Sequence, residues 1–166
     1  LTQVTDTRLR DLVRTCGREG AQAAWEAGAA ALEQIHELIR DEEIACRFRW
    51  VPGYLNASIR NGRREERAWL EEDARLAREF GFEAQLVDTA PGFLGPAVRF
   101  GRQASFHPLL YLAAQIEKLP GDGCQVFENT VVESIEGAAP VLRAAGRRVA
   151  CEWVVIATHH PIAGRK

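Results

Sequence analysis

The sequence predicts an α+β fold of α/β-derived type, in which helices accompany a mixed or antiparallel sheet. Three patterns favour this class. Apolar residues recur at helical spacing over 21–39, they alternate with charged residues over 44–50, and the last third of the chain is composed of short strand-like segments. One of these segments, Trp153–Ala157, is apolar throughout, which is typical of a strand covered on both faces.

The first 60 residues predict two helices followed by a strand. A short helix is expected over 7–15, and Cys16-Gly17 provides its stop. A second helix over 21–39 presents one broad apolar stripe, in which Trp25 is the largest side chain. The strand over 44–50 turns Ile44, Cys46, Phe48 and Trp50 to one face and Arg47 and Arg49 to the other, and Pro52-Gly53 ends or bends it.

The middle of the chain predicts a helix, a long loop and another helix. The helix over 65–80 ends at Gly81. Residues 88–106 hold three glycines and two prolines, so we expect a binding loop or lid there and no long regular element. His107 begins a fourth helix over 107–116, in which Pro108 occupies the tolerated first position.

The final third predicts strands and no further helix. Two of the strands form an antiparallel hairpin around Ala145-Gly146-Arg147. The expected strands are 125–127, 131–135, 141–144, 148–152 and 153–157. No repeat, low-complexity run or linker indicates an internal domain boundary, so we expect a single unit over 1–166.

Composition excludes several classes of protein. The 166 residues are 46% hydrophobic and 27% charged, which does not fit disorder or a membrane protein. The 21 basic and 23 acidic residues give a net charge of −2 and are interspersed, so no nucleic-acid partner is expected. No apolar run is long enough to span a bilayer and the first residues do not resemble a secretory signal, so we expect a cytoplasmic location.

No short motif specifies a reaction centre. The four cysteines form no Cys-x-x-Cys pair, and adjacent residues such as His159 and His160 point to opposite faces of a strand, so no metal site is expected. The chain also lacks G-x-G-x-x-G, a P-loop, H-E-x-x-H and G-x-S-x-G.

Three passages, in this order, together resemble the FAD-dependent oxidoreductases of the D-amino-acid oxidase (DAO) superfamily. They are AVRFGRQASFHPLLYL (97–112), GCQVFENTVVESI (123–135) and WVVIATHHP (153–161). With Val4-Thr5 and the helix over 21–39, the resemblance covers nearly the whole chain. It implies that residues 1–40 and 107–166 belong to a Rossmann-like FAD-binding domain, and that residues 41–106 belong to a substrate domain.

The resemblance also implies roles for single residues. Val132 would offer its backbone N–H and C=O to the adenine, Ala157 would allow close approach, and Thr158 would bind a ribose or phosphate oxygen. His159 would stand near a point where many members have glycine. The implied substrate-binding residues are Tyr54 and His107, with a core position for Tyr54 and a helix-capping role for His107 as the alternatives.

The implied activity is oxidation of a C–N bond in an amine or amino acid by hydride transfer to FAD. Because the family's glycine fingerprint is absent, we expect an internal fragment that lacks the N-terminal dinucleotide-binding motif and the C-terminal segment, binds FAD weakly or not at all by itself, and self-associates through unpaired sheet edges. Two alternatives stay open. One is a non-enzymatic α+β binding or interaction module, and the other is a flavin enzyme fused to an iron–sulfur domain.

Overall fold

The computed structural model describes residues 1–57 and 63–159, and the chain divides into two compact units. The first unit is Leu1–Glu117 and the second is Lys118–Lys166. Both contain antiparallel sheet, and the first also contains the helices, so the predicted α+β class is confirmed. Among the described residues, no helix is both long and apolar enough to cross a membrane.

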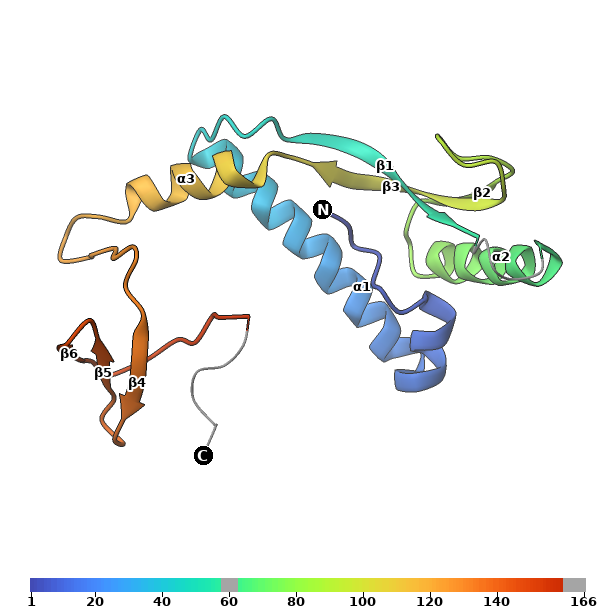
Figure 1. The fold of residues 1–166 in the computed structure, drawn as a ribbon. Helices are drawn as coiled ribbons and strands as arrows, with labels where there is room; N and C mark the ends of the chain where they lie inside the picture. The colour runs from blue at the N-terminus through green and yellow to red at the C-terminus, as the bar shows by residue number, and fades with distance from the viewer. Residues whose placement is uncertain (58–62, 160–166) are drawn as a thin grey trace. The chain divides into compact units, whose positions relative to one another are not determined.

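The first unit is built on a three-stranded antiparallel sheet (Figure 1). Its order is β1-β3-β2, formed by β1 (Arg49–Asn56), β3 (Ala97–Ser105) and β2 (Ala84–Val87). The central strand, β3, lies within residues 88–106, so the prediction of a loop without a long regular element was wrong there. Its pairing partners are at least ten residues away along the chain, and this non-local pairing outweighs the local glycine and proline signal.

A β-bulge interrupts the pairing of β1 with β3. Val51 pairs with Gln103 and Gly53 with Phe100, so Gly101 and Arg102 of β3 face the single residue Pro52. Arg102 takes a left-handed φ of 48° at this point. The predicted end or bend at Pro52-Gly53 is therefore a bend, and β1 continues to Asn56.

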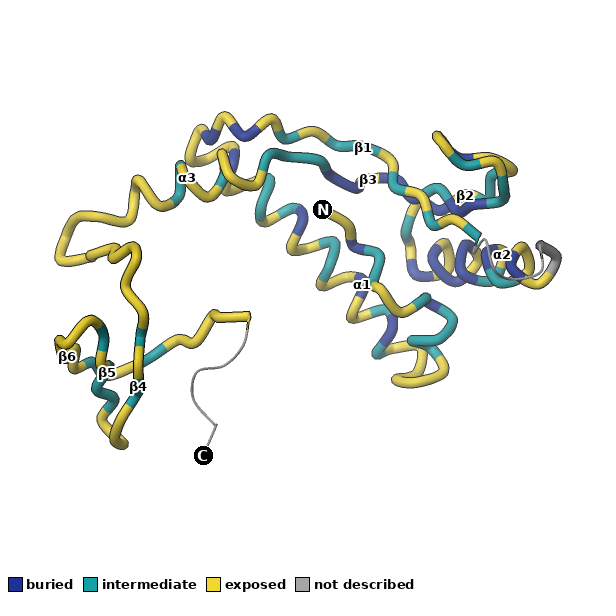
Figure 2. The backbone as a smooth tube through the Cα atoms, viewed as in Figure 1, coloured by how far each residue is buried: buried dark blue, intermediate teal, exposed yellow. Residues whose placement is uncertain are grey.

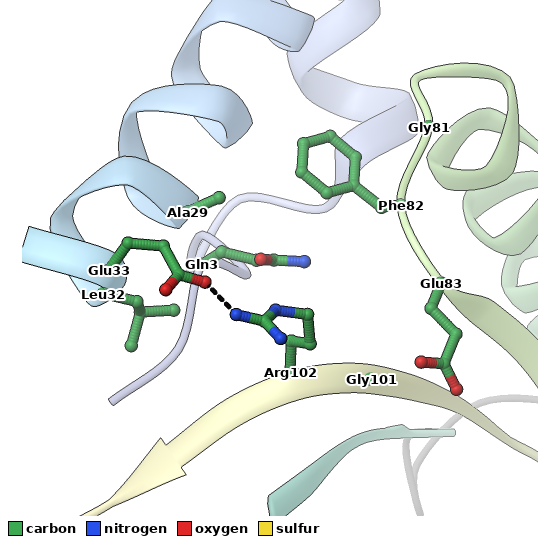
Figure 3. A pocket seen from close by; sticks show the side chains of 9 residues that line it. All are labelled: Gln3, Ala29, Leu32, Glu33, Gly81, Phe82, Glu83, Gly101 and Arg102. Carbon is green, nitrogen blue, oxygen red and sulfur yellow. Dashed lines mark hydrogen bonds and ion pairs between the residues drawn. The ribbon is translucent and has the colours of Figure 1, made fainter. Parts of the chain in front are cut away.

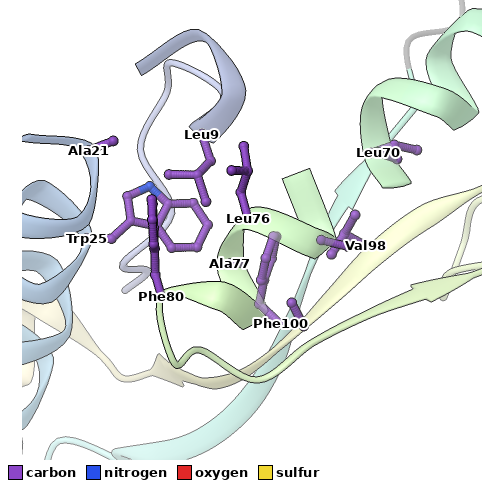
Figure 4. Packing of buried hydrophobic residues seen from close by; sticks show 11 residues of the cluster. Leu9, Ala21, Trp25, Leu70, Leu76, Ala77, Phe80, Val98 and Phe100 are labelled. Atoms are coloured by element: carbon purple, nitrogen blue, oxygen red, sulfur yellow. The ribbon is translucent and has the colours of Figure 1, made fainter. Parts of the chain in front are cut away.

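Two helices supply the core of the first unit. Side chains from α1 (Leu9–Asp41) and α2 (Arg63–Glu79) meet those of β2 and β3 in one buried cluster (Figure 4). Trp25 of α1 is the largest side chain in this cluster, and its ring makes edge-to-face contacts with Phe82 and Phe100 at centroid distances of 5.5 and 5.4 Å. Figure 2 shows the buried positions along α1, α2 and β3.

The helix α1 consists of two helical segments separated at Gly17. Gly17 has φ 76° and ψ 173°, values that no residue inside a helix adopts, so the sequence-predicted stop is confirmed. The stripe on the longer segment is also confirmed at its buried positions, which are Ala21, Trp25, Leu32 and Ile39.

A smaller hydrophobic cluster lies at the C-terminal end of α1. Ile39, Ile44 and Cys46 are buried there, and Phe48, Tyr111 and other partly buried side chains pack against them. Tyr111 belongs to α3 (Pro108–Lys118), whose other large apolar side chains, including Leu109 and Leu112, are exposed. The expected strand over 44–50 begins only at Arg49, although burial alternates from Ile44 as predicted.

The second unit is a three-stranded antiparallel sheet. Its order is β4-β5-β6, formed by β4 (Val132–Glu136), β5 (Val141–Ala144) and β6 (Arg147–Ala150). The predicted hairpin is confirmed, because Ala144 pairs with Arg147 across Ala145 and Gly146. No residue of this unit that the structure describes is buried.

Two strand predictions in this unit were wrong. Residues 125–127 are irregular, and so is Trp153–Ala157, in which Trp153 and Val155 are 86% and 89% exposed. A strand covered on both faces needs neighbouring strands and helices, and none of the three strands described in this unit pairs with Trp153–Ala157. His160 and Pro161, at the end of that passage, lie outside the described residues.

Candidate functional site

A groove of about 420 Å³ lies where the N-terminal segment passes β1. Tyr54 lines it, together with apolar side chains from Val4, Leu55 and Phe100. Polar groups come from Thr2, Thr5 and Asp6. Thr5 is held by two hydrogen bonds: its hydroxyl donates to the Thr7 carbonyl at 2.7 Å and accepts from Trp25 Nε1 at 3.3 Å. The groove thus joins a fixed polar rim to an apolar wall.

Tyr54 lies on the sheet face opposite to the core. It pairs in register with Arg99, while the neighbouring residues Val98 and Phe100 turn inward. Arg99 is bound to Glu83 at 2.7 Å, and the pKa of its guanidinium is raised first by this carboxylate and also by Tyr54. Tyr54 is 36% exposed, so the alternative of a buried core tyrosine does not describe it.

The N-terminal wall of this groove is held by Gln103. Its Oε1 accepts hydrogen bonds from the Thr2 hydroxyl at 2.7 Å and from the Gln3 backbone N–H at 3.0 Å. Its Nε2 donates to the Gly101 carbonyl at 2.6 Å. The amide is buried, so one side chain from the bulged strand fixes the residues that line the groove.

A second cavity, of about 130 Å³, lies between α1 and the bulge (Figure 3). Its charged residues are already paired within the chain: Glu33 binds Arg102, and Glu83 binds Arg99. Arg102 also lies over the Trp50 ring, 4.6 Å from its centroid. A ligand in this cavity would have to displace these contacts, so the groove beside Tyr54 is the better candidate.

A buried ion cluster joins α1 to α2. Arg8 binds Asp73 at 2.8 Å and Glu66 at 3.1 Å, and both carboxylates are at most 2% exposed. Burial raises the pKa of the Asp73 carboxyl, although the Arg10 N–H and the Arg8 guanidinium act in the opposite direction. None of these residues lines the Tyr54 groove, so the cluster has a structural role.

His107 lies at the start of α3, away from the Tyr54 groove. Its Nδ1 accepts a hydrogen bond from the Leu110 backbone N–H at 3.3 Å, which is the capping interaction considered from the sequence. His107 lines a third groove, also of about 420 Å³, with Arg47, Arg49, Ser105, Phe106 and Pro108. The two residues predicted to bind substrate therefore line separate grooves.

The four residues predicted to bind the cofactor belong to the second unit. Val132 is half-buried and begins β4, an edge strand that pairs only with β5 among the strands described. The backbone groups on its other edge are therefore open to a partner. Ala157, Thr158 and His159 are exposed and follow in irregular backbone.

Comparison with known proteins identifies the family. The sequence profile of the FAD dependent oxidoreductases, named DAO, matches residues 7–163. The chain belongs to this family. It is also 26% identical over 155 residues to a protein of Bacillus subtilis (strain 168) named "Putative Rieske 2Fe-2S iron-sulfur protein YhfW".

That alignment covers 91% of this DAO family member and 30% of the Bacillus protein, so the chain spans less than a third of its relative. No solved structure matches the chain. The family membership confirms the resemblance stated from the three sequence passages.

Several residues around the grooves of this DAO family member were not predicted as site residues. Asp6 and Gln103 gave no signal, because their roles depend on contacts made after folding. Arg47 and Arg49 were visible in the sequence, because they alternate with Phe48 and Trp50 and so lie on the outward side of the segment 44–50.

Proposed function

We propose that this chain is part of a flavoenzyme that oxidises a C–N bond of an amine or amino acid by hydride transfer to FAD. The observation that carries the proposal is the DAO family match over residues 7–163. The Tyr54 groove supports it, because this groove has a carboxylate and hydroxyl groups beside an apolar wall.

Within this proposal, the groove binds the substrate. The Asp6 carboxylate accepts N–H groups of the amine, and its charge favours the substrate's approach. Val4, Leu55 and Phe100 enclose the substrate's carbon chain and exclude water, whereas the side chain of Tyr54 lies on the opposite face of the sheet from Leu55 and Phe100. None of these groups is assigned as acid or base.

The second unit contributes to cofactor binding. The open edge of β4 suits an adenine, which the Val132 backbone N–H and C=O would bind. Ala157 would allow close approach, and the Thr158 hydroxyl and the His159 imidazole would bind ribose or phosphate oxygens. Bound FAD supplies the acceptor for the hydride that leaves the carbon next to the substrate nitrogen.

We place the enzyme in the cytoplasm. All four cysteines are free thiols, and a reducing compartment keeps them so.

The test is anaerobic reduction of FAD in the intact protein by a panel of amines and amino acids. A productive substrate bleaches the oxidised-flavin absorbance. Asp6→Asn should raise KM by about tenfold, as expected for loss of a charged hydrogen-bond acceptor. Glu19→Gln removes an exposed carboxylate of α1 outside the groove and should leave KM unchanged.

Absence of flavin reduction by every compound would contradict the proposal. Binding of an amine without reduction would favour the non-enzymatic module. Thr158→Val should lower the affinity for FAD, and unchanged affinity would remove Thr158 from the cofactor site.

A second candidate is a flavin enzyme that works with an iron–sulfur cluster carried elsewhere in the protein. The name of the Bacillus relative, which describes a Rieske 2Fe-2S protein, favours it. Iron and sulfide analysis of the intact protein together with electron paramagnetic resonance of its reduced form would decide between the two.

A further inference from the structure

Two arginines lie close together on the segment that leads from α1 into β1. Between and after them, Phe48 and Trp50 turn toward α1, where their rings pack with His36 at centroid distances of 4.9 and 5.3 Å. Arg47 and Arg49 are exposed and line the groove that also contains His107. The aromatic packing therefore fixes the segment whose two guanidinium groups line this groove.

The groove has a fixed frame. Arg49 pairs with Ser105 across the first rung of the β1–β3 ladder. The His107 backbone N–H donates to the Cys46 carbonyl at 2.7 Å. Arg47 lies between these two connections, so backbone hydrogen bonds tie both walls of the groove together.

The charge of this groove differs from that of the other two. Its lining contains two arginines and no carboxylate, whereas Glu33 and Glu83 line the cavity beside the bulge and Asp6 lines the Tyr54 groove. Over residues 1–57 and 63–159, neither Arg47 nor Arg49 takes part in an ion pair, although many other arginines of the chain do. Both guanidinium charges are therefore available to a ligand.

The remaining polar groups of the groove are hydrogen-bond donors as well. Because His107 Nδ1 accepts from the Leu110 N–H, the proton of the neutral ring resides on Nε2. The Ser105 hydroxyl adds a further donor. Two guanidinium groups, an imidazole N–H and a hydroxyl together match the acceptor oxygens of an anion.

We propose that this groove binds the oxyanion of a small molecule, either a carboxylate or a phosphate. Arg47 and Arg49 supply the charge, and His107 and Ser105 supply directional hydrogen bonds. The site is distinct from the Tyr54 groove and does not rest on the proposed flavin chemistry, so its test needs neither FAD nor turnover.

The test is a titration of the purified chain with inorganic phosphate and, separately, with succinate, at constant ionic strength set with sodium chloride. Two-dimensional NMR follows the backbone amides of 105–110 and the Nε–H signals of the arginines. We expect saturable shifts at Arg47 and Arg49 with a dissociation constant of about 1 mM, typical of a small, partly exposed ion. Chloride alone should give no saturable shift.

Three variants make the test specific. The double variant Arg47→Gln/Arg49→Gln should weaken binding by at least about tenfold, and Arg147→Gln, which removes one exposed arginine from β6, should leave it unchanged. His107→Asn keeps a side-chain acceptor that can cap α3 but lacks the Nε2 donor, and should weaken binding by about threefold. Circular dichroism checks that each variant is folded.

Saturation by phosphate alone would identify a phosphate ligand, saturation by succinate alone would identify a carboxylate ligand, and either result supports the site. Equal affinity in the wild type and the double variant would overturn the proposal, as would shifts that chloride reproduces.

Discussion

The Asp73 carboxylate of α2 accepts a hydrogen bond, at 2.9 Å, from the Arg10 backbone N–H in the first turn of α1. The residue before that turn, Arg8, makes no side-chain capping bond to it. A carboxylate from a second helix therefore caps the N-terminus of α1, a role that a serine or aspartate at the N-cap position usually has. Arg8 instead binds Asp73 and Glu66, so the same contact joins the two helices that cover the sheet.

Replacing this carboxylate should destabilise the first unit strongly. Asp73→Ala removes the cap of α1 and leaves Arg8 short of a buried partner, so we expect a loss of about 3 kcal/mol in the free energy of unfolding. Urea denaturation followed by circular dichroism measures it. Glu71→Ala breaks an exposed pair with Arg67 on the same helix and should cost less than about 0.5 kcal/mol. Equal costs for the two variants would refute the capping role.

The raised pKa of Asp73 predicts how this contribution depends on pH. In the folded state the carboxyl keeps its proton above its ordinary pKa of 3.8, because burial raises its pKa. The folded state then binds more protons than the unfolded state, so the contribution of Asp73 to stability falls as the pH rises through this window. Above the folded pKa it becomes constant.

The measurement is the difference in unfolding free energy between wild type and Asp73→Asn at several pH values. We expect it to shrink from below pH 3.8 toward neutrality. Arginine partners lower the pKa values of the exposed carboxyls of Glu79 and Glu136, so the contribution of these two groups to stability rises with pH. Both groups are present in both proteins, so their contributions cancel in the difference. A difference that grows with pH would show that the Arg8 pairing dominates.

Gly53 and Gln103 should be energetically coupled. A Cβ on Gly53 would lie 2.7 Å from Gln103 Cγ, and three hydrogen bonds hold the Gln103 side chain in place. Gly53→Ala should therefore cost about 2 kcal/mol in the wild type and clearly less in the Gln103→Ala background. A double-mutant cycle on unfolding free energies measures the coupling, and additive costs would contradict it.

The β5–β6 turn offers a stabilising substitution. Ala145 and Gly146 have φ values of 48° and 71°, as in the two-residue turn that favours Asn-Gly. Ala145→Asn should stabilise the hairpin by about 0.5 kcal/mol, whereas Gly146→Ala should cost about 1 kcal/mol because alanine is strained there. Hydrogen exchange of the β5 and β6 amides reports both effects. Faster exchange in Ala145→Asn would rule out this turn geometry.

Local signals in the sequence predicted the elements that depend on local contacts. The stop at Gly17, the buried stripe around Trp25 and the hairpin at Gly146 all follow from spacing and turn chemistry. The strand β3 did not, because its glycines and prolines suggested a loop and its partners are distant in sequence. The opposite error occurred at Trp153–Ala157, which was predicted to be a strand and is irregular. An apolar run does not form a strand without neighbouring strands.

The candidate sites divide in the same way. The spacing of Arg47 and Arg49 was visible in the sequence, and Tyr54 and His107 followed from the family resemblance. The sequence did not indicate that Asp6 would line the same groove as Tyr54, or that His107 would join the arginines instead. The first grouping depends on hydrogen bonds that hold the N-terminal segment to Gln103 of β3, and the second depends on strand pairing across about 50 residues. No local pattern encodes either.

The amino-acid sequence alone thus determined the family, the α+β class and the helices, because periodicity and the order of segments are properties of neighbouring residues. The tertiary structure decided that β3 is the central strand and that a bulge places Arg102 over Trp50. It also decided that Asp73 of α2 caps α1, a helix whose first turn lies more than 60 residues earlier in the chain. Each of these depends on residues that only the folded backbone brings within hydrogen-bonding or packing distance.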